Sequence, residues 1–298
     1  MLSLRVIGLC CCLLLAMPVQ AFNITHIRDH DEIIESGYLK VAVYEDYPPY
    51  SFMQDGQPRG VDVELAKALA AELGVELRLQ WMAPDENFDG DLRNHLWKGH
   101  YLRPGQIADV MLRAPNDKAY SNMRDDLGLP AHELIHMFGA YQQERWQAAY
   151  DPRKIDAVPS IAIFQYHPVG VEEDSIPAFY LASVMNGQLS KMTRHYRNLG
   201  QAFAAMETGE VHAVMGTQAE IDWLLAEHAD AGMQLTENAY PNMGKQVWDL
   251  GMAVHDSNRQ LAYALGDIAE AMVLDGRMAA LYADYGLRYM LPSYYTDI

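Results

Sequence analysis

Three residues near the middle of the chain have the types and spacing of a zinc-binding catalytic motif. His132, Glu133 and His136 form the pattern H-E-x-x-H, and Gly139 follows at the spacing of a longer zinc-binding form of the motif. On a helix, histidines four residues apart lie on one face and can bind Zn²⁺, while the glutamate acts as a general base. The motif would give a zinc metallopeptidase if this segment is helical.

The sequence around the motif favours a strand instead. Pro130 and Gly139 bracket a short segment, and the string ELIHMFGAY is typical of a strand. The third histidine of the longer form is replaced by Gln142. Because histidines on a strand do not meet on one helical turn, we interpret the match as accidental. The metallopeptidase stays a remote alternative, and we expect no enzyme, no catalytic residue, no metal site and no cofactor.

A second group of polar side chains has the composition of a cation site. Asp85, Asn87, Asp89 and Gly90 fit the first half of a calcium-binding loop, whose ligands are carboxylate and amide oxygens. The twelfth position should be a bidentate glutamate, and it is Leu96. We therefore expect an acidic turn that caps the following helix, and whether this loop also binds an ion stays open.

The elements that would position a ligand site are clearest in the segment 39–69. Apolar residues alternate from position 39 to position 43, as in a half-buried strand, and two prolines at 48 and 49 end it. Tyr47, Tyr50 and Phe52 lie on the turn that follows, at the carboxyl end of the strand, where open α/β sheets bind their ligands. From Asp62, a candidate N-cap, apolar residues take helical spacing. This arrangement favours a binding cleft.

Predicted strands and helices alternate along the rest of the chain. Further strands are expected at 75–82, at 108–115, in SIAIFQY, in EVHAVMG and in WDLGMAV, with helices between them and two amphipathic helices at 261–275 and 278–285. Alternation of this kind implies a mostly parallel sheet with right-handed crossovers. The chain is longer than a single core usually supports, so we expect two lobes.

The N-terminal composition and the charge limit the compartment and the partners. Arg5, an apolar run at 6–17 and the small-residue end Val19-Gln20-Ala21 predict a signal peptide over residues 1–21. Cys10, Cys11 and Cys12 all lie inside it, so no disulfide is expected. We expect a periplasmic protein without a membrane span after cleavage. The formal net charge of −18 argues against nucleic acid as a partner.

The motifs of this chain resemble the family 3 extracytoplasmic solute-binding proteins. Gly60, Asp62 and Leu65 match the family's Gly-x-Asp-x-Asp-Leu helix start, with Glu64 in place of the second Asp. The string METGEVHAVMG corresponds to its Leu-x-x-Gly-x-x-Asp-Ala strand, with His212 at the Asp position. LAYALGDIAEAMVLDGRMAALYADYG matches the closing helix pair.

The resemblance implies a two-lobed α/β fold of the type II periplasmic-binding-protein kind. Each lobe would be a mostly parallel sheet flanked by helices, and two crossover strands would join the lobes near 138–149 and 247–254. Lobe one would comprise residues 22–142 and 250–298, and lobe two residues 143–249. A small solute in the interlobe cleft and an ABC permease would be the partners of such a protein.

The chain departs from the amino-acid binders of this family at both charge-pairing positions. Those proteins hold the α-carboxylate with an Arg from a Thr-x-x-Arg stretch, and the α-ammonium with an Asp after the Gly-x-x-Asp-Ala strand. Here the first stretch reads MLRAPNDKAYSN, so Arg113 or Arg124 would have to substitute, and the ammonium position falls at Thr217. A neutral hydroxyl does not pair an ammonium as a carboxylate does.

Four segments give a narrower resemblance to the J-type periplasmic proteins encoded with PQQ-dependent methanol and alcohol dehydrogenases. They are DENFDGDLRNHLWKGHY, ADVMLRAP, HMFGAYQQERWQAAYD and PVGVEEDSIPAFYL. The resemblance implies a non-catalytic accessory of a quinoprotein dehydrogenase. The substrate-binding component of an ABC transporter for a small polar solute, such as an amino acid, is the alternative.

The residues expected around the cleft are carried over by position from these resemblances. The two tyrosines would stack on a ligand, the charged residues would pair with it, and the threonine would contact it through its hydroxyl. The set comprises Tyr47, Tyr50, Arg93, Trp97, Arg113, Glu144, Arg145, Glu173 and Thr217.

Overall fold

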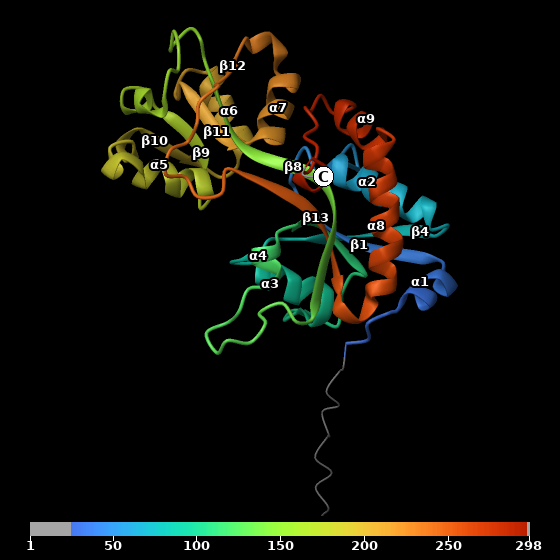
Figure 1. The fold of residues 1–298 in the computed structure, drawn as a ribbon. Helices are drawn as coiled ribbons and strands as arrows, with labels where there is room; N and C mark the ends of the chain where they lie inside the picture. The colour runs from blue at the N-terminus through green and yellow to red at the C-terminus, as the bar shows by residue number, and fades with distance from the viewer. Residues whose placement is uncertain (1–24, 297–298) are drawn as a thin grey trace, which may run out of the picture.

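The computed structural model describes residues 25–296 (Figure 1). The predicted signal peptide at 1–21 lies outside the described residues. Within residues 25–296, no helix combines the length and the hydrophobicity that a membrane span requires.

The first part of the described chain builds most of one lobe. Its elements are α1 (His30–Ser36), β1 (Tyr38–Tyr44), β2 (Phe52–Gln54), β3 (Gln57–Arg59), α2 (Val61–Glu72), β4 (Glu76–Met82), α3 (Phe88–Leu92), a π-helical turn (Arg93–Trp97), β5 (Gly99–His100), β6 (Arg103–Pro104), β7 (Val110–Pro115) and α4 (Lys118–Ser121).

The long strand β8 (Ile135–Tyr150) then leads into the second lobe, and β13 leads back. The elements of the second lobe are β9 (Val169–Glu172), α5 (Ile176–Gly187), β10 (Thr193–Tyr196), α6 (Leu199–Glu207), β11 (Ala213–Thr217), α7 (Gln218–Glu227) and β12 (Gln234–Leu235). The return strand is β13 (Val247–His255), and α8 (Arg259–Leu274) and α9 (Arg277–Ala283) follow it in lobe one.

One continuous strand path runs through both lobes in the order β10-β9-β11-β8-β13-β7-β1-β4. In lobe one, β1 is parallel to β4 and β7, and in lobe two β9 is parallel to β10 and β11. The antiparallel pair β8 and β13 joins them (Figure 1). The predicted two-lobed α/β fold is therefore confirmed. The lobe boundaries at 142/143 and 249/250 stay a prediction, because β8 and β13 run across them without a break.

Helices bury the apolar faces of both sheets. In lobe one, Leu65 of α2 and Leu265 of α8 pack with Val41 of β1, and on the other face Leu92 of α3 packs with Met111 of β7. In lobe two, α5 covers one face of the sheet, and α6 and α7 cover the other. Burial of each leucine-sized side chain contributes about 1.5–3 kcal/mol, so these faces hold the lobes together.

One predicted strand is wrong. The string SIAIFQY forms a short 3₁₀ helix at Ile161–Gln165 rather than a strand. Its two fully buried residues, Ile161 and Phe164, are three positions apart. That spacing puts both side chains on one side of a 3₁₀ turn, whereas a strand would send them to opposite faces.

Candidate functional site

The H-E-x-x-H segment does not form a helix. β8 begins at Ile135, after a turn, so His132 and His136 do not share a helical face. The Nε2 atom of His132 lies 2.9 Å from Oδ1 of Asp89, while the ring of His136 lies parallel to that of Phe138. Residues 25–296 contain no cluster of three or more side chains of the metal-binding types. The prediction of a strand at His136 is confirmed.

The side-chain oxygens of the acidic turn at 85–91 accept hydrogen bonds from the backbone of the turn and from side chains of the helical residues that follow. Asn87 caps α3 by accepting a hydrogen bond from the Gly90 amide at 3.0 Å. Oδ2 of Asp85 accepts hydrogen bonds from Arg93 and Asn94, and Oδ1 of Asp91 accepts one from the Asp85 amide. The prediction of a helix-capping turn is confirmed.

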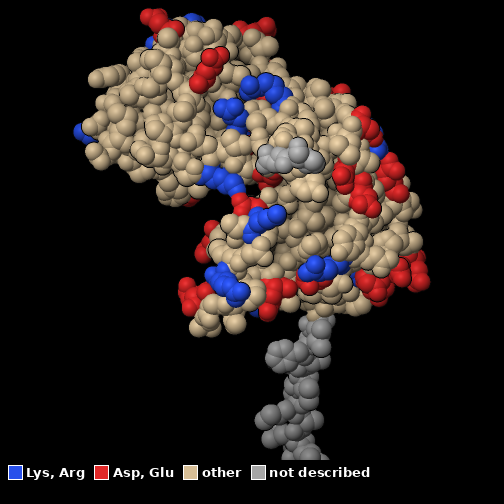
Figure 2. Space-filling view, viewed as in Figure 1, with Lys and Arg blue, Asp and Glu red and all other residues tan. Residues whose placement is uncertain are grey.

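A cavity of about 580 Å³ opens between the lobes, where Figure 2 shows the surface hollowed. Lobe one contributes the residues after β1, the crossover strands contribute two tryptophans, and lobe two contributes the ends of β9 and β11. The polar and aromatic residues that line it are Tyr44, Glu45, Asp46, Tyr47, Phe88, Arg113, Trp146, Glu172, Asp174, Ser175, Thr217, Glu220 and Trp248.

A glycine fixes the tyrosine-bearing turn at the mouth of this cleft. Gly60 has φ +117°, and a Cβ there would lie 2.2 Å from the Tyr50 carbonyl oxygen, so only glycine fits. The amides of Val61 and Asp62 donate to the carbonyls of Pro49 and Tyr50. Gly60, which matches the family motif, therefore lets the tyrosine-bearing turn pack closely against the start of α2.

Asp62 is not the N-cap that we predicted. α2 begins after Gly60, and the Asp62 side chain is buried, with Oδ1 accepting from the Tyr141 hydroxyl at 3.3 Å. Burial raises the pKa of Asp62 to about 6, although nearby Arg113 lowers it. The residue lies buried behind the cleft floor, with Oδ2 3.9 Å from Nη1 of Arg113, and does not line the cavity itself.

Arg113 lies at the centre of that floor and is 8 % exposed. Its Cζ atom lies 3.4 Å from the centroid of the Tyr50 ring and 5.7 Å from that of Tyr47, which are cation–π distances. Its Nη1 atom donates to Oε1 of Gln142 at 3.3 Å and lies 3.9 Å from Oδ2 of Asp62. The guanidinium is therefore held over the Tyr50 ring, and Arg113 lines the cavity.

A break in strand register explains why Arg113 points into the cleft. Opposite β13, Ala114 pairs with Gly251 and Leu112 with Met252, so Arg113 is the extra residue of a β-bulge. Its φ is +61°, in the left-handed region. A bulge redirects the side chain that it carries, and strained backbone of this kind concentrates at functional sites.

Glu144 on β8 accepts hydrogen bonds from both lobes. Its Oε2 atom accepts from the Tyr50 hydroxyl at 2.7 Å and from Gln142 at 3.0 Å, and Oε1 accepts from the Gln218 amide at 3.1 Å. Burial raises the pKa of Glu144, and the charge of Arg113 opposes that effect. This side chain therefore connects the tyrosine turn of lobe one to the start of α7 in lobe two.

Thr217 and Glu220 form the lobe-two wall. Thr217 ends β11 and caps α7, and Glu220 completes the capping box. The Oε2 atom of Glu220 accepts from the Thr217 hydroxyl at 2.6 Å, and the oxygen of that hydroxyl lies 2.9 Å from the Tyr50 hydroxyl oxygen. Burial raises the pKa of Glu220 to about 7, and the neighbouring charges of Glu172 and Glu144 raise it further.

Five of the nine residues expected around the cleft come together. Tyr47, Arg113 and Thr217 line the cavity, and Tyr50 and Glu144 lie directly behind them in the hydrogen-bond network.

The other four expected residues do not line the cavity. Arg93 pairs with Asp85, and Trp97 packs against the lobe-one core. The side chain of Arg145 is not among the lining residues, and Glu173 is exposed while its neighbour Glu172 faces the cavity.

Several lining residues were missed from the sequence. Glu220 was detectable, since Thr217 and Glu220 have the T-x-x-E spacing of a capping box. Trp146 and Trp248 lie on the two crossover strands with ring centroids 4.6 Å apart, a pairing that required the register of β8 and β13.

The fold is that of the type II periplasmic binding proteins. An ancestral cationic amino acid solute-binding protein aligns with a TM-score of 0.66 at 20 % identity, covering 86 % of this chain and 98 % of that one. An amino acid ABC transporter substrate-binding protein from Streptococcus pneumoniae, bound to L-arginine, aligns with a TM-score of 0.59 at 19 % identity, covering 86 % and 97 %.

Sequence similarity is concentrated at the start of lobe one. Residues 39–96 match the family model of the bacterial extracellular solute-binding proteins, family 3. Cyclohexadienyl dehydratase from Pseudomonas aeruginosa is 46 % identical over 48 residues, which cover 16 % of this chain and 18 % of the relative's length.

The prediction that the chain is not an enzyme is overturned. The curated relative is named as a dehydratase, and a solved structure with a TM-score of 0.58 and 20 % identity, covering 86 % of this chain and 98 % of that one, is described as a precursor of cyclohexadienyl dehydratase. The segment that resembles solute-binding proteins therefore occurs in an enzyme as well, and it gives no ground for excluding catalysis.

Proposed function

We propose that this protein is an extracytoplasmic solute-binding protein of family 3 that binds a small amine or amino acid in the interlobe cleft. The match of residues 39–96 to that family and the type II fold support the class. The observation that carries the ligand chemistry is Glu220. Its carboxylate stands at Thr217, the position where the amino-acid binders that this chain resembles hold the α-ammonium.

The balance of charge in the cleft favours a cationic group. Arg113 is the cation of the floor, Asp62 and Glu144 lie close enough to interact with its charge, and the carboxyl groups of Glu172 and Glu220 line the same cavity. Burial raises the pKa of all four, which means that their ionised forms are poorly compensated. An ammonium group would compensate them, because a buried charge is stable only when paired.

Arg113 can also receive a carboxylate. Its guanidinium lines the cavity and has donors beyond the one that it gives to Gln142. Guanidinium groups bind carboxylates through two parallel hydrogen bonds. A ligand that carries both an ammonium and a carboxylate would therefore extend from Glu220 in lobe two to Arg113 in lobe one, and closure of the lobes around β8 and β13 would enclose it.

A thermal-shift panel tests this proposal. Ligands that bind the folded state raise the melting temperature by mass action, so amino acids and amines should raise it while their N-acetylated counterparts should not. Glu220→Gln should remove the shift. Glu227→Gln, at the exposed end of the same helix, is the matched control and should retain it. An equal shift in the Glu220→Gln variant would contradict the proposal.

A second candidate, the accessory of a quinoprotein dehydrogenase, is supported by one further observation. In the segment PVGVEEDSIPAFYL, which resembles the J-type proteins, Ile176 lines the cleft and is 55 % exposed, and Phe179, three residues further along α5, is 60 % exposed. Exposed apolar side chains of this size suit a protein contact. Capture of a purified quinoprotein dehydrogenase that is lost in Phe179→Ser and kept in Tyr101→Ser would support this role, and no capture would oppose it.

A further inference from the structure

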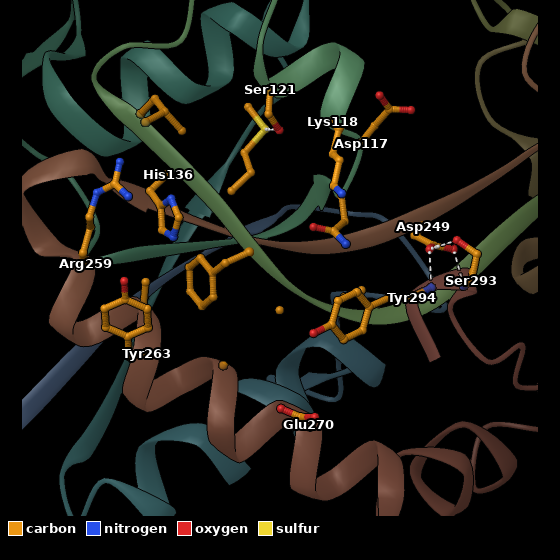
Figure 3. Close-up of a pocket in the computed structure, with 18 of the residues that line it drawn as sticks. Asp117, Lys118, Ser121, His136, Asp249, Arg259, Tyr263, Glu270, Ser293 and Tyr294 are labelled. Carbon is orange, nitrogen blue, oxygen red and sulfur yellow. Dashed lines mark hydrogen bonds between the residues drawn. The ribbon is translucent and has the colours of Figure 1, made fainter. Parts of the chain in front are cut away.

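A second hollow, of about 870 Å³, lies on lobe one between β8, α4, α8 and the C-terminal segment (Figure 3). It is distinct from the interlobe cleft. Successive residues of β13 face the two sites: Trp248 and Leu250 line the cleft, and Asp249 lines the hollow. We call this hollow the aromatic groove, for the rings of His136, Phe138, Tyr263, Tyr294 and Tyr295 that line it.

The rings come from three separate segments and surround the open space. His136 and Phe138, both on β8, have ring planes within 6° of parallel and centroids 5.8 Å apart. Figure 3 shows Tyr263 of α8 and Tyr294 of the C-terminal segment on opposite sides of the cavity. These two tyrosines are 66 % and 61 % exposed. Both rings are therefore accessible from the cavity and from solvent.

One face of α8 forms a wall of the groove. Gly266 lies beside the ring of Phe138, where a Cβ would meet that ring at 3.5 Å, an ordinary van der Waals distance. Tyr263, Gly266 and Glu270 lie three and four residues apart and therefore share one face of α8. The ring of Tyr263, the position of Gly266, which has no side chain, and the carboxylate of Glu270 follow one another along the wall of the cavity.

The charges of the groove are mainly acidic. Asp117, Asp249, Asp267 and Glu270 line it together with Lys118 and Arg259. Arg259 is paired with Asp256 at 2.6 Å, Asp117 with Lys245, and Asp249 accepts hydrogen bonds from Ser293 and Gln143. Glu270 and Asp267 are exposed carboxylates on the groove face of α8.

His136 contributes a partly buried aromatic ring to the lining of the groove. Burial and the charge of Arg259 lower the pKa of His136. A lowered pKa favours the neutral ring, which does not repel a cation.

We propose that the aromatic groove is a second binding site, for an organic cation of the alkylated ammonium class. The cation packs against the faces of Tyr263, Phe138 and Tyr294, and Glu270 supplies the counter-charge. Rings of this kind attract a cation within about 6 Å of their centroids, and cages of several rings select quaternary ammonium groups. The proposal does not rest on the function of the cleft.

Calorimetric titration with choline tests the proposal, with the uncharged isostere 3,3-dimethylbutan-1-ol as the matched ligand. We expect saturable binding of choline and none of the isostere. Tyr263→Leu should weaken choline binding about fivefold, which is the size of one cation–π contact at an exposed site. Glu270→Gln should weaken it by up to about fivefold, which is the size of one exposed ion pair. Tyr101→Leu removes a tyrosine that is 80 % exposed elsewhere and should leave the affinity unchanged.

Two further measurements separate this site from the cleft and from loss of fold. Glu220→Gln, in the cleft, should leave choline binding intact, and the variants with exposed substitutions, Tyr263→Leu, Glu270→Gln and Tyr101→Leu, should keep the wild-type melting temperature. Equal binding of the isostere, no saturable binding of choline, or loss of choline binding in Glu220→Gln alone would overturn the proposal.

Discussion

The interlobe cleft and the aromatic groove lie on opposite sides of strand β13, and they differ in how deeply their charged groups are buried. In the cleft, Arg113 and Glu144 are almost fully buried and hydrogen-bonded to other buried groups. In the groove, Glu270 and Tyr263 lie at the surface. Removing one partner of a buried charge network costs stability, whereas an exposed group contributes little to it. Binding chemistry in the cleft is therefore coupled to folding, and in the groove it is not.

The largest expected effect comes from replacing Arg113, the cation at the centre of the cleft network. Arg113→Met should cost about 3–5 kcal/mol of unfolding free energy, because it leaves buried Asp62 and Glu144 without their cation. Urea unfolding measures it. Arg124→Met is the control, since Arg124 is exposed and donates to the Gly128 carbonyl, and it should change stability by less than about 0.5 kcal/mol. A loss of unfolding free energy below about 1 kcal/mol for Arg113→Met would contradict the claim that the charges of the cleft, unlike those of the groove, are coupled to folding.

The next effect is a pH dependence of stability. Burial raises the pKa of Glu220 from its ordinary value of 4.5 to about 7 on folding, so the folded state binds a proton that the unfolded state releases. The stability that Glu220 contributes by binding this proton is present below about pH 4.5 and is lost as the pH rises through 7, on the order of 3 kcal/mol. Asp62, with a pKa of about 6, acts in the same direction.

Urea unfolding between pH 5 and 8 measures this dependence. The wild type should lose stability across the range, and Glu220→Gln should show a flatter profile because its amide does not titrate. The control Glu227→Gln should follow the wild type. Identical slopes for wild type and Glu220→Gln would show that Glu220 is ionised in the folded protein.

A smaller effect concerns the contact between the lobes. Tyr50→Phe removes the hydroxyl that bonds Glu144 and Thr217, and we expect a loss of about 1–2 kcal/mol. Tyr101→Phe, which alters an exposed tyrosine, should have no effect. Thermal unfolding of the two variants side by side checks this, and equal melting temperatures would mean that the hydroxyl contributes no net stability.

The smallest expected effects come from the groove. Tyr263→Leu and Glu270→Gln should each change the unfolding free energy by less than about 0.5 kcal/mol, because both side chains are exposed. Urea unfolding again provides the measure. A loss comparable to that of Arg113→Met would show that the groove is part of the folding core, and the contrast between the two sites would disappear.

The sequence predicted the elements better than the side-chain directions. Alternation and turn residues located β1, the tyrosine turn and α2, because these signals are local. The two crossover strands required the family resemblance. The bracketing Pro130 and Gly139 and the string ELIHMFGAY predicted a strand rather than a helix at the H-E-x-x-H segment, and β8 does run through His136.

The site was predicted only in part because its geometry depends on contacts between distant segments. The bulge that directs Arg113 into the cleft exists only when β7 pairs with β13. Asp174, at φ +58°, shapes the turn after β9 that leaves Glu172 facing the cavity and Glu173 exposed. Neither feature has a signature in the residues themselves. The capping box that positions Glu220 does have one, and it was overlooked.

The central claim is that the Glu220 carboxylate receives a ligand ammonium in the cleft. Isothermal titration of L-arginine, or of the amine with the largest thermal shift, against wild type, Glu220→Gln and Glu227→Gln tests it most directly. We predict that the wild-type affinity rises as the pH increases through about 7, where Glu220 ionises, and that Glu220→Gln binds at least tenfold more weakly while Glu227→Gln is unchanged. Equal, pH-independent affinity in all three proteins would contradict the claim.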